Sequence, residues 1–535
     1  MKYSFKIKTL GVALMAVSIL SSCTSDFDEI NKDPNSLTED QIDASMTGPA
    51  FATALYAGIH NGAGETTGYA DDQGTWGIAT GILSSTFVQY LSCGYGTERN
   101  DFVNGYESRG WTRFYTIATP SLNYAFKAAQ GNAEATAILK IWKVFMYNQM
   151  VDAYGPIPYS EAGNGKEKVP YDSVESIYED FFKLLNEANA TLGSTSVSTV
   201  LGLESTDRVY QGSTDKWRIF GNSLRLRLAL RIADVQPAKA KTEAEAAVAA
   251  GVMQNNQQSA YFLVSTITPN NLNMVVGGWG YKMTSSMESL LIGYSDPRLQ
   301  KWFSPGNTGL YIGRPVGTVN NYFDQEKNKA FSPFNENVLG LGPNPGSSPL
   351  SNTKNIEILM ASENYFTRAE GALNGWNMGG TAQALYEEGI RLSMAQWGIT
   401  DATAVNSYIA GTSLPTAPNV NTIYPGLVTE SIPVKLPVAW SASVADQRTQ
   451  IAVQKYLAIF PESWEAFSDL RRSDAKVIYQ PLNTDNTDAG VGKSLLKRII
   501  YVTNEYSSNK EAVEDAITKL GGPDTGGTKL WWDTK

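Results

Sequence analysis

Hydrophobic positions recur with helical spacing along much of the chain. Residues 134–152 carry Ile138, Ile141, Trp142 and Phe145 at i, i+3, i+4 and i+7, which is the pattern of one buried helix face. Similar patterns or start signals predict further helices after the capping box at Thr38–Gln41 and at residues 172–185, 238–250, 357–397, 443–468 and 511–519. We therefore expect a mainly α-helical protein.

Residues 214–233 fit two patterns. Leu224, Leu226 and Leu228 alternate with Arg, as in a half-buried strand. Trp217, Phe220, Leu224 and Leu228 also form one helical face, and Leu, Arg and Ala favour helix. We predict a helix here.

Two long segments lack helical periodicity. Residues 61–110 are rich in Gly, Thr and Asp, and residues 252–355 are rich in Asn, Gly, Pro, Ser and aromatics. We expect loops with short strands and helices in both. Ala382, Tyr386 and Gly389 have the spacing of a tetratricopeptide-repeat helix. The other helices lack that regularity, so any repeats are degenerate.

The first residues resemble a lipoprotein export signal. A basic start precedes an apolar run, residues 10–20, that is too short to span a bilayer. The run ends in Leu-Ser-Ser-Cys, which resembles the bacterial lipobox. We predict a signal peptide at residues 1–22, lipidation of Cys23 and a tether at residues 23–37. The alternative is an ordinary signal peptide with a coincidental Cys.

Acidic residues follow directly behind Cys23. Asp26, Asp28 and Glu29 look like the surface-export signal of Bacteroidetes lipoproteins, and a solvated acidic tether is the alternative. Several acyl chains on Cys23 would give a stable membrane anchor. We expect a protein anchored in the outer membrane that faces the cell surface.

Charge and residue counts exclude several function classes. The 535 residues include 43 Lys and Arg against 53 Asp and Glu, a net charge of −10. Removal of residues 1–22 takes away three Lys and gives −13. Such a chain is a poor nucleic-acid partner. One His and two Cys rule out a His-rich metal site and a Cys-ligand zinc site.

Catalytic residues are scarce. Cys93 would need His60 as its base, so a buried small residue is the favoured interpretation. Glu462 and Glu465 lie one helical turn apart and cannot flank a glycosidic bond, so we expect ion pairing or capping near Arg471 and Arg472. We expect no enzyme and no cofactor. Oxygen ligands for structural Ca²⁺ are plentiful, but no spacing indicates a site.

Sugar binding depends less on particular residue types than catalysis does. The apolar face of a pyranose stacks on an exposed aromatic ring, and its hydroxyls need polar partners nearby. Trp142, Trp217 and Trp464 lie on apolar helix faces and are expected in the core. Aromatic and polar residues in the loops are the candidate ligand site, with burial in a loop-packed core as the alternative for each: Tyr69, Trp76, Tyr95, Arg99, Asn100, Trp279, Tyr281 and Tyr322.

Several short motifs follow one another in order along the chain. They are residues 27–35 (FDEINKDPN), 152–162 (DAYGPIPYSEA), 222–227 (NSLRLR) and 365–372 (YFTRAEGA), Trp464-Glu465 with Arg471-Arg472, and the tail through Arg498, Asn504-Glu505 and residues 531–533 (WWD). Together these motifs resemble the SusD/RagB family of Bacteroidetes outer-membrane lipoproteins. One departure is Val502, where many relatives carry Pro.

The resemblance implies one α-rich domain over residues 38–535. In it about four degenerate tetratricopeptide-repeat helix pairs would form a scaffold, and irregular loops at about 61–110 and 252–355 would carry the ligand site. It also implies a nutrient-binding lipoprotein that acts as a lid on a SusC-like TonB-dependent transporter and performs no chemistry. The expected ligand is an oligosaccharide. Peptide capture, as in the RagB branch, is the alternative.

Overall fold

The computed structural model describes residues 42–59, 76–93, 96–102, 105–166, 168–265, 267–272, 279–319, 323, 325–335, 338, 354–488 and 490–535. The predicted capping box at Thr38–Gln41 and the predicted signal peptide and tether lie outside these residues. The first described elements are a 3₁₀ turn at Ala44–Met46, capped by Asp43, and α3 (Thr47–Gly58). Pro49 lies in the first turn of α3, where its missing N–H costs nothing.

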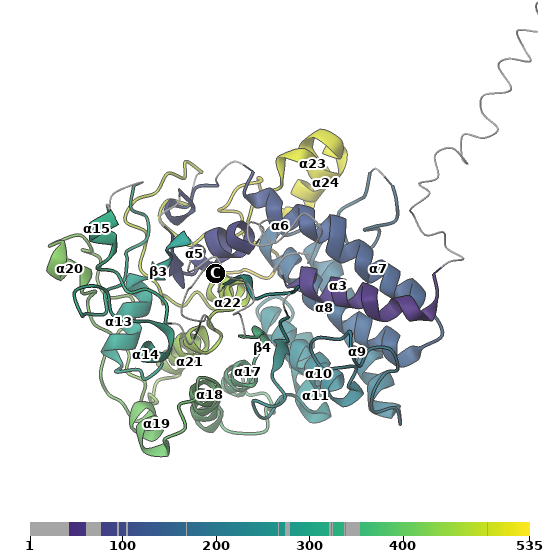
Figure 1. Ribbon diagram of the computed structural model, residues 1–535, viewed down its shortest axis with the longest axis horizontal. Helices are drawn as coiled ribbons and strands as arrows, with labels where there is room; N and C mark the ends of the chain where they lie inside the picture. The colour runs from purple at the N-terminus through teal and green to yellow at the C-terminus, as the bar shows by residue number, and fades with distance from the viewer. Residues whose placement is uncertain are drawn as a thin grey trace, which may run out of the picture.

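Helices dominate the described chain, as the hydrophobic pattern predicts. The predicted helix at 134–152 is α8, and the ambiguous segment 214–233 is helical over most of its length, as α10. In Figure 1 α3 and α6 to α11 gather on one side of the molecule and α13 to α21 on the other, whereas α5 lies beside β3 (Lys282–Met283). The described N-terminal helices after α3 are α5 (Ser85–Phe87), α6 (Glu107–Arg113), α7 (Thr119–Ala128), α8 (Ala133–Tyr154), α9 (Val174–Ser194), α10 (Thr214–Arg231) and α11 (Pro237–Ala250).

The second group contains shorter helices and the C-terminal ones. In Figure 1, α22 lies near the centre, while α23 and α24 return to the side of α6. This group comprises α13 (Ser285–Gly293), α14 (Leu299–Trp302), α15 (Gln325–Asn328), α17 (Ala361–Leu373), α18 (Ala382–Gln396), α19 (Ala402–Ile409), α20 (Val420–Ile423), α21 (Val444–Ala458), α22 (Ser463–Ser473), α23 (Thr503–Ser508) and α24 (Lys510–Leu520).

Neighbouring helices pack in pairs. α8 packs on α9, α10 on α11 and α17 on α18, while α3 packs on α7. The number of tetratricopeptide-like repeats stays a prediction of the resemblance.

Two helix boundaries differ from the prediction. Residues 443–468 are not one helix: α21 ends at Ala458 and α22 begins at Ser463. Pro461 lies between them, and proline interrupts the hydrogen bonds of a helix interior, so the prediction of one continuous helix was wrong. The helix start expected at Asp172 lies one residue later, because Ser173 caps α9 by accepting a hydrogen bond from the Ser176 N–H.

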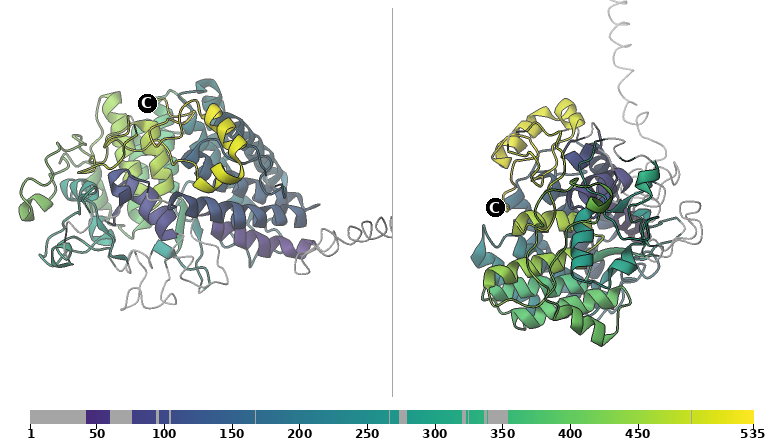
Figure 2. Two further views of the ribbon diagram at one scale, coloured as in Figure 1. Left: turned by 90° about the horizontal axis from the view of Figure 1, so that it is seen from above. Right: turned by 90° about the vertical axis from the view of Figure 1, so that its left-hand side faces the viewer.

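Short strands form antiparallel pairs in the described chain. β1 (Leu91–Ser92) pairs antiparallel with β3 (Lys282–Met283), and Leu91 lies opposite Met283. β2 (Ala260–Phe262) pairs antiparallel with β4 (Ile356–Leu359). Of these strands, β1, β2 and β3 lie in segments where loops with short strands are predicted, whereas β4 occupies the start of the helix predicted at 357–397, which begins only at Ala361. The first pair joins the segment around residue 90 to the segment around residue 282, which brings two loop-rich regions together. Figure 2 shows the molecule from two further sides.

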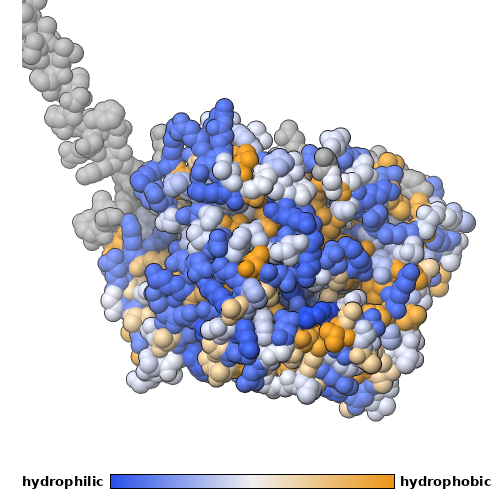
Figure 3. All heavy atoms as spheres, turned by 180° about the vertical axis from the view of Figure 1, so that it is seen from behind, coloured by the Kyte–Doolittle hydropathy of each residue, from blue (hydrophilic) through white to orange (hydrophobic). Residues whose placement is uncertain are grey.

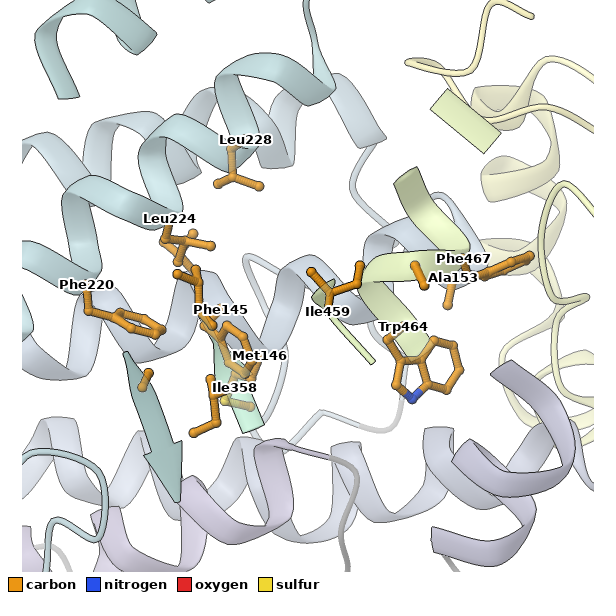
Figure 4. Close-up of a cluster of buried hydrophobic side chains, with 14 of the residues drawn as sticks. Phe145, Met146, Ala153, Phe220, Leu224, Leu228, Ile358, Ile459, Trp464 and Phe467 are labelled. Atoms are coloured by element: carbon orange, nitrogen blue, oxygen red, sulfur yellow. The ribbon is translucent and has the colours of Figure 1, made fainter. Parts of the chain in front are cut away.

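The core joins helices that are distant in sequence. Figure 4 shows Phe145 and Met146 of α8, Phe220 and Leu224 of α10, and Trp464 of α22 within one cluster. All five are buried. Trp142 and Trp217 are buried too, so the three tryptophans predicted from apolar helix faces are confirmed as core residues.

A network of buried ion pairs runs through the same region. Arg227 of α10 bonds Glu363 of α17 at 2.6 Å. Arg231, one turn further on, bonds Glu465 of α22 at 2.7 Å and lies 3.2 Å from Asp152 of α8. Each charge is desolvated but paired, so the network fixes how four helices meet.

Candidate functional site

The structure describes five of the eight predicted ligand-site residues. Tyr69, Tyr95 and Tyr322 lie outside the described residues, as does the predicted lipidation site Cys23. Trp76, Arg99, Asn100, Trp279 and Tyr281 are described. Trp76, Trp279 and Tyr281 form one group, and Arg99 and Asn100 form the other. The two groups have different neighbours.

Trp279 and Tyr281 form a stacked pair. Their ring centroids are 6.4 Å apart and their planes differ by 23°. The two rings are two residues apart in sequence, immediately before β3. Gly280 lies between them with φ +70°, a backbone conformation that glycine adopts without steric cost. Trp279 is 38% exposed, whereas Tyr281 is 1% exposed. The pair therefore offers one ring to solvent and holds the other inside.

Trp76 and Tyr281 both lie close to Gly81. A Cβ on Gly81 would lie 2.8 Å from the Tyr281 hydroxyl and 3.2 Å from the Trp76 ring. The absence of a side chain at Gly81 is what lets both aromatics approach. The Tyr281 hydroxyl also donates to the Gly77 carbonyl at 3.4 Å. Two segments 200 residues apart thus meet in one aromatic cluster, and no spacing in the sequence indicated Gly81.

Burial decides which of these rings can stack on a ligand. Trp76 is 7% exposed, so it and Tyr281 lack the free face that a sugar needs. Tyr281 stacks on Trp279 and supports it, whereas Trp76 lies with Tyr281 beside Gly81. A ring held from below keeps its orientation without a ligand, which lowers the entropy cost of binding. Among the described candidates, Trp279 is the one that meets the exposure requirement.

Arg99 and Asn100 have different partners. The Arg99 guanidinium donates to Asp485 at 2.5 Å and to the Thr318 carbonyl at 2.9 Å. The Asn100 amide donates to the carbonyls of Gly492 and Ser494, each at 2.9 Å. Both side chains are buried. They hold the 484–494 loop to the body of the protein, and this geometry argues against direct ligand contact.

Two asparagines that precede Trp279 in the sequence also form hydrogen bonds within the protein. Asn270 and Asn271 are buried. The Asn270 amide donates to the Lys354 carbonyl at 3.2 Å, and the Asn271 amide donates to the Tyr56 hydroxyl at 3.2 Å. They fix the chain that leads toward Trp279 and do not face a ligand.

The carboxylates weighed for catalysis have structural roles. Glu462 accepts hydrogen bonds from the backbone N–H groups of Trp464 and Glu465, so the predicted capping is confirmed. Burial raises the pKa of Glu462 to about 7. Glu465 pairs with Arg231 rather than with Arg471 or Arg472. Neither carboxylate points at an open site.

Comparison with known proteins gives the class. The family model described as SusD-like, "Susd and RagB outer membrane lipoprotein", matches residues 29–533. The chain belongs to this family. A search of curated proteins found no match. No helix in the described part of the chain has both the length and the apolar character needed to cross a membrane.

Solved structures support the same fold. A chitin-binding SusD homologue from Flavobacterium johnsoniae is 31% identical, has a TM-score of 0.79, and is matched over 91% of this chain and 99% of its own. A SusD-like protein from Bacteroides thetaiotaomicron is 25% identical with a TM-score of 0.78, over 91% and 99%. A SusD homologue from Bacteroides uniformis is 29% identical with a TM-score of 0.77, over 92% and 99%.

Proposed function

We propose that this protein captures oligosaccharides at the cell surface and delivers them to a SusC-like TonB-dependent transporter. The observation that carries the proposal is Trp279, an exposed ring stacked on the buried ring of Tyr281. Such a ring suits the apolar face of a pyranose. Family membership and the chitin-binding relative from Flavobacterium johnsoniae support a glycan ligand.

The proposed role involves no chemistry. Of the carboxylates weighed for catalysis, Glu462 caps a helix and Glu465 pairs with Arg231, which leaves neither free to act as acid or base. Binding and release are the whole of the proposed activity.

The proposed location is the outer membrane, through lipid on Cys23, with the protein facing the cell surface. The basic start, apolar run and terminal Cys of residues 1–23 support it, as does membership of a family of outer membrane lipoproteins.

Peptide capture is the second candidate function. The family includes RagB, and the resemblance implies that this branch takes peptides. A calorimetric titration of the purified protein with chitooligosaccharides, other oligosaccharides and mixed peptides separates the two. Saturable heat with one glycan supports the proposal. Heat with peptides alone contradicts the choice of ligand and assigns the protein to the peptide branch.

A further inference from the structure

A long trough lies on the face that bears the chain end. Three neighbouring cavities of about 310, 380 and 660 Å³ share lining residues. The first two share Glu430 and Lys493, and the last two share Lys435 and Lys535. The chain end lies on the face shown in Figure 3, which is hollowed near its centre. Neither Trp279 nor Tyr281 lines any of the three cavities.

One segment, residues 429–435, follows the trough from end to end. Thr429 lines the first cavity, Ser431 the second and Val434 the third. The segment is neither helix nor strand. Fully extended, seven residues would span roughly 23 Å. The trough is thus suited to an elongated ligand that lies along this segment.

The segment is held in place, but its backbone groups are free. Asn421 bonds both the N–H and the carbonyl of Val428 before it, and the Tyr294 hydroxyl donates to the Leu436 carbonyl after it. Within the described part of the chain, no backbone N–H or C=O of residues 429–435 makes a hydrogen bond. An ordered run of free N–H and C=O groups is what an incoming strand pairs with.

Positive charge gathers in the central cavity. Six Lys or Arg side chains line it against three Asp or Glu, whereas the whole chain carries a net charge of −10. Lys476 is paired with Asp474 at 2.7 Å, and Lys535 with Asp234 at 3.0 Å. Among the described residues, no carboxylate lies within ion-pairing distance of Lys435 or Lys493. The Lys493 ammonium donates one hydrogen bond to the Leu482 carbonyl, which leaves two of its three N–H groups. The charges of Lys435 and Lys493 can therefore still meet an acidic ligand.

We propose that residues 429–435 form a docking groove for an extended acidic segment of a partner protein. The partner's backbone pairs with the free N–H and C=O groups, and its carboxylates meet Lys435 and Lys493. Pro433 has no backbone N–H, so the donors of the groove come from the residues on either side of it. This site is separate from the proposed glycan site at Trp279.

The probe is a fluorescent decapeptide of alternating Glu and Thr. Its binding to the purified full chain is measured by fluorescence anisotropy. It should bind saturably. The Lys-Thr analogue should not bind, and N-methylation of alternate residues should weaken binding about tenfold or more, because it removes the paired N–H groups. The double variant Lys435→Glu, Lys493→Glu should abolish binding. The matched control Lys183→Glu, an exposed residue of α9, should not change it.

Three results would overturn the proposal: no saturable binding of the Glu-Thr peptide, equal binding of its N-methylated form, or displacement by oligogalacturonate, which would indicate an acidic glycan site. If the double variant misfolds, Lys435→Gln provides the same test with a smaller change. Trp279→Ala should leave peptide binding intact, so a failure of the glycan proposal would be seen separately.

Discussion

At the scale of single residues, Gly81 sets how closely Tyr281 and Trp76 approach. A methyl group there would lie 2.8 Å from the Tyr281 hydroxyl, too close without a shift. Gly81→Ala should lower the free energy of unfolding by about 1–3 kcal/mol and displace the support of Trp279, which should weaken glycan binding. Chemical denaturation and calorimetry measure the two effects.

The matched control is Gly193→Ala. A Cβ at Gly193 would lie 3.7 Å from the Arg218 side chain, an ordinary contact, and alanine favours helix. Stability should stay the same or rise. Equal losses in the two variants would refute the role given to Gly81.

Only part of the site could be predicted at this scale. An aromatic residue beside polar ones in a loop indicated Trp279, and the structure leaves that ring exposed. The same signal indicated Trp76 and Tyr281, which are buried. Composition cannot separate these cases, because Tyr281 packs against Gly77 and Gly81, about 200 residues away in the sequence. Arg99 was predicted to contact the ligand because it lies in a loop with aromatic and polar residues. Its partner Asp485 comes from a segment that no local sequence pattern connects to Arg99.

At the scale of elements, Glu288 links α13 to two loops. Its carboxylate accepts hydrogen bonds from the backbone N–H groups of Gly313 and Asn419. Burial raises the pKa of Glu288 from 4.5 to about 8. The folded state therefore binds a proton that the unfolded state releases between about pH 4.5 and 8, so this group lowers stability as pH rises through that range.

Glu288→Gln should flatten part of this pH dependence. The amide resembles the protonated acid and cannot ionise. The free energy of unfolding should fall less between pH 5 and 8 in the variant than in the wild type, as measured by denaturation at several pH values. Parallel curves for the two proteins would contradict the prediction.

The buried ion pairs connect helices rather than loops. Glu465→Gln removes the carboxylate that pairs with Arg231 at 2.7 Å. Asp152 still lies 3.2 Å from Arg231, so the loss should be about 3 kcal/mol, at the low end of the cost of breaking a buried pair. Glu243→Gln breaks the less enclosed pair with Arg225 and should cost about 1 kcal/mol or less. If the two variants lost similar amounts of free energy of unfolding in denaturation experiments, the buried network would not be what fixes the helices.

Helix positions were largely predictable, whereas one boundary was not. In α8 and α9 the apolar face is continuous, so the spacing alone located them. Between α21 and α22 the apolar pattern continues across Pro461, and the pattern concealed the break. The sequence of α10 fits both a strand and a helix pattern. Charged residues usually mark the exposed face, but Arg227 and Arg231 are buried, so the polar positions could not distinguish the two.

At the scale of the whole molecule, three of the described segments that carry the family resemblance meet in the core. They supply Asp152, Arg227 and Glu465 to the buried ion network. Spacing within one segment could not reveal this, because Arg227 and its partner Glu465 are far apart in the sequence. For the same reason, the order of the segments along the chain indicated the family better than the spacing inside any one segment.

The proposed membrane anchor also acts on the whole molecule. Cys23→Ala should abolish incorporation of labelled fatty acid and release the protein from the membrane fraction, because no other lipid attachment is proposed. Cys93→Ala, the matched control at the second cysteine, should leave both unchanged. Labelling of the Cys23→Ala protein would refute lipidation at this residue.

The central claim is glycan capture by the exposed ring of Trp279, and one titration tests it most directly. Chitooligosaccharide is titrated calorimetrically into the wild type, Trp279→Ala and Tyr124→Ala, the last being an exposed aromatic on α7. We predict saturable binding that Trp279→Ala weakens about tenfold or more, because the lost ring contact is worth about 1.5–3 kcal/mol, and that Tyr124→Ala leaves unchanged. Binding that survives Trp279→Ala intact would contradict the account.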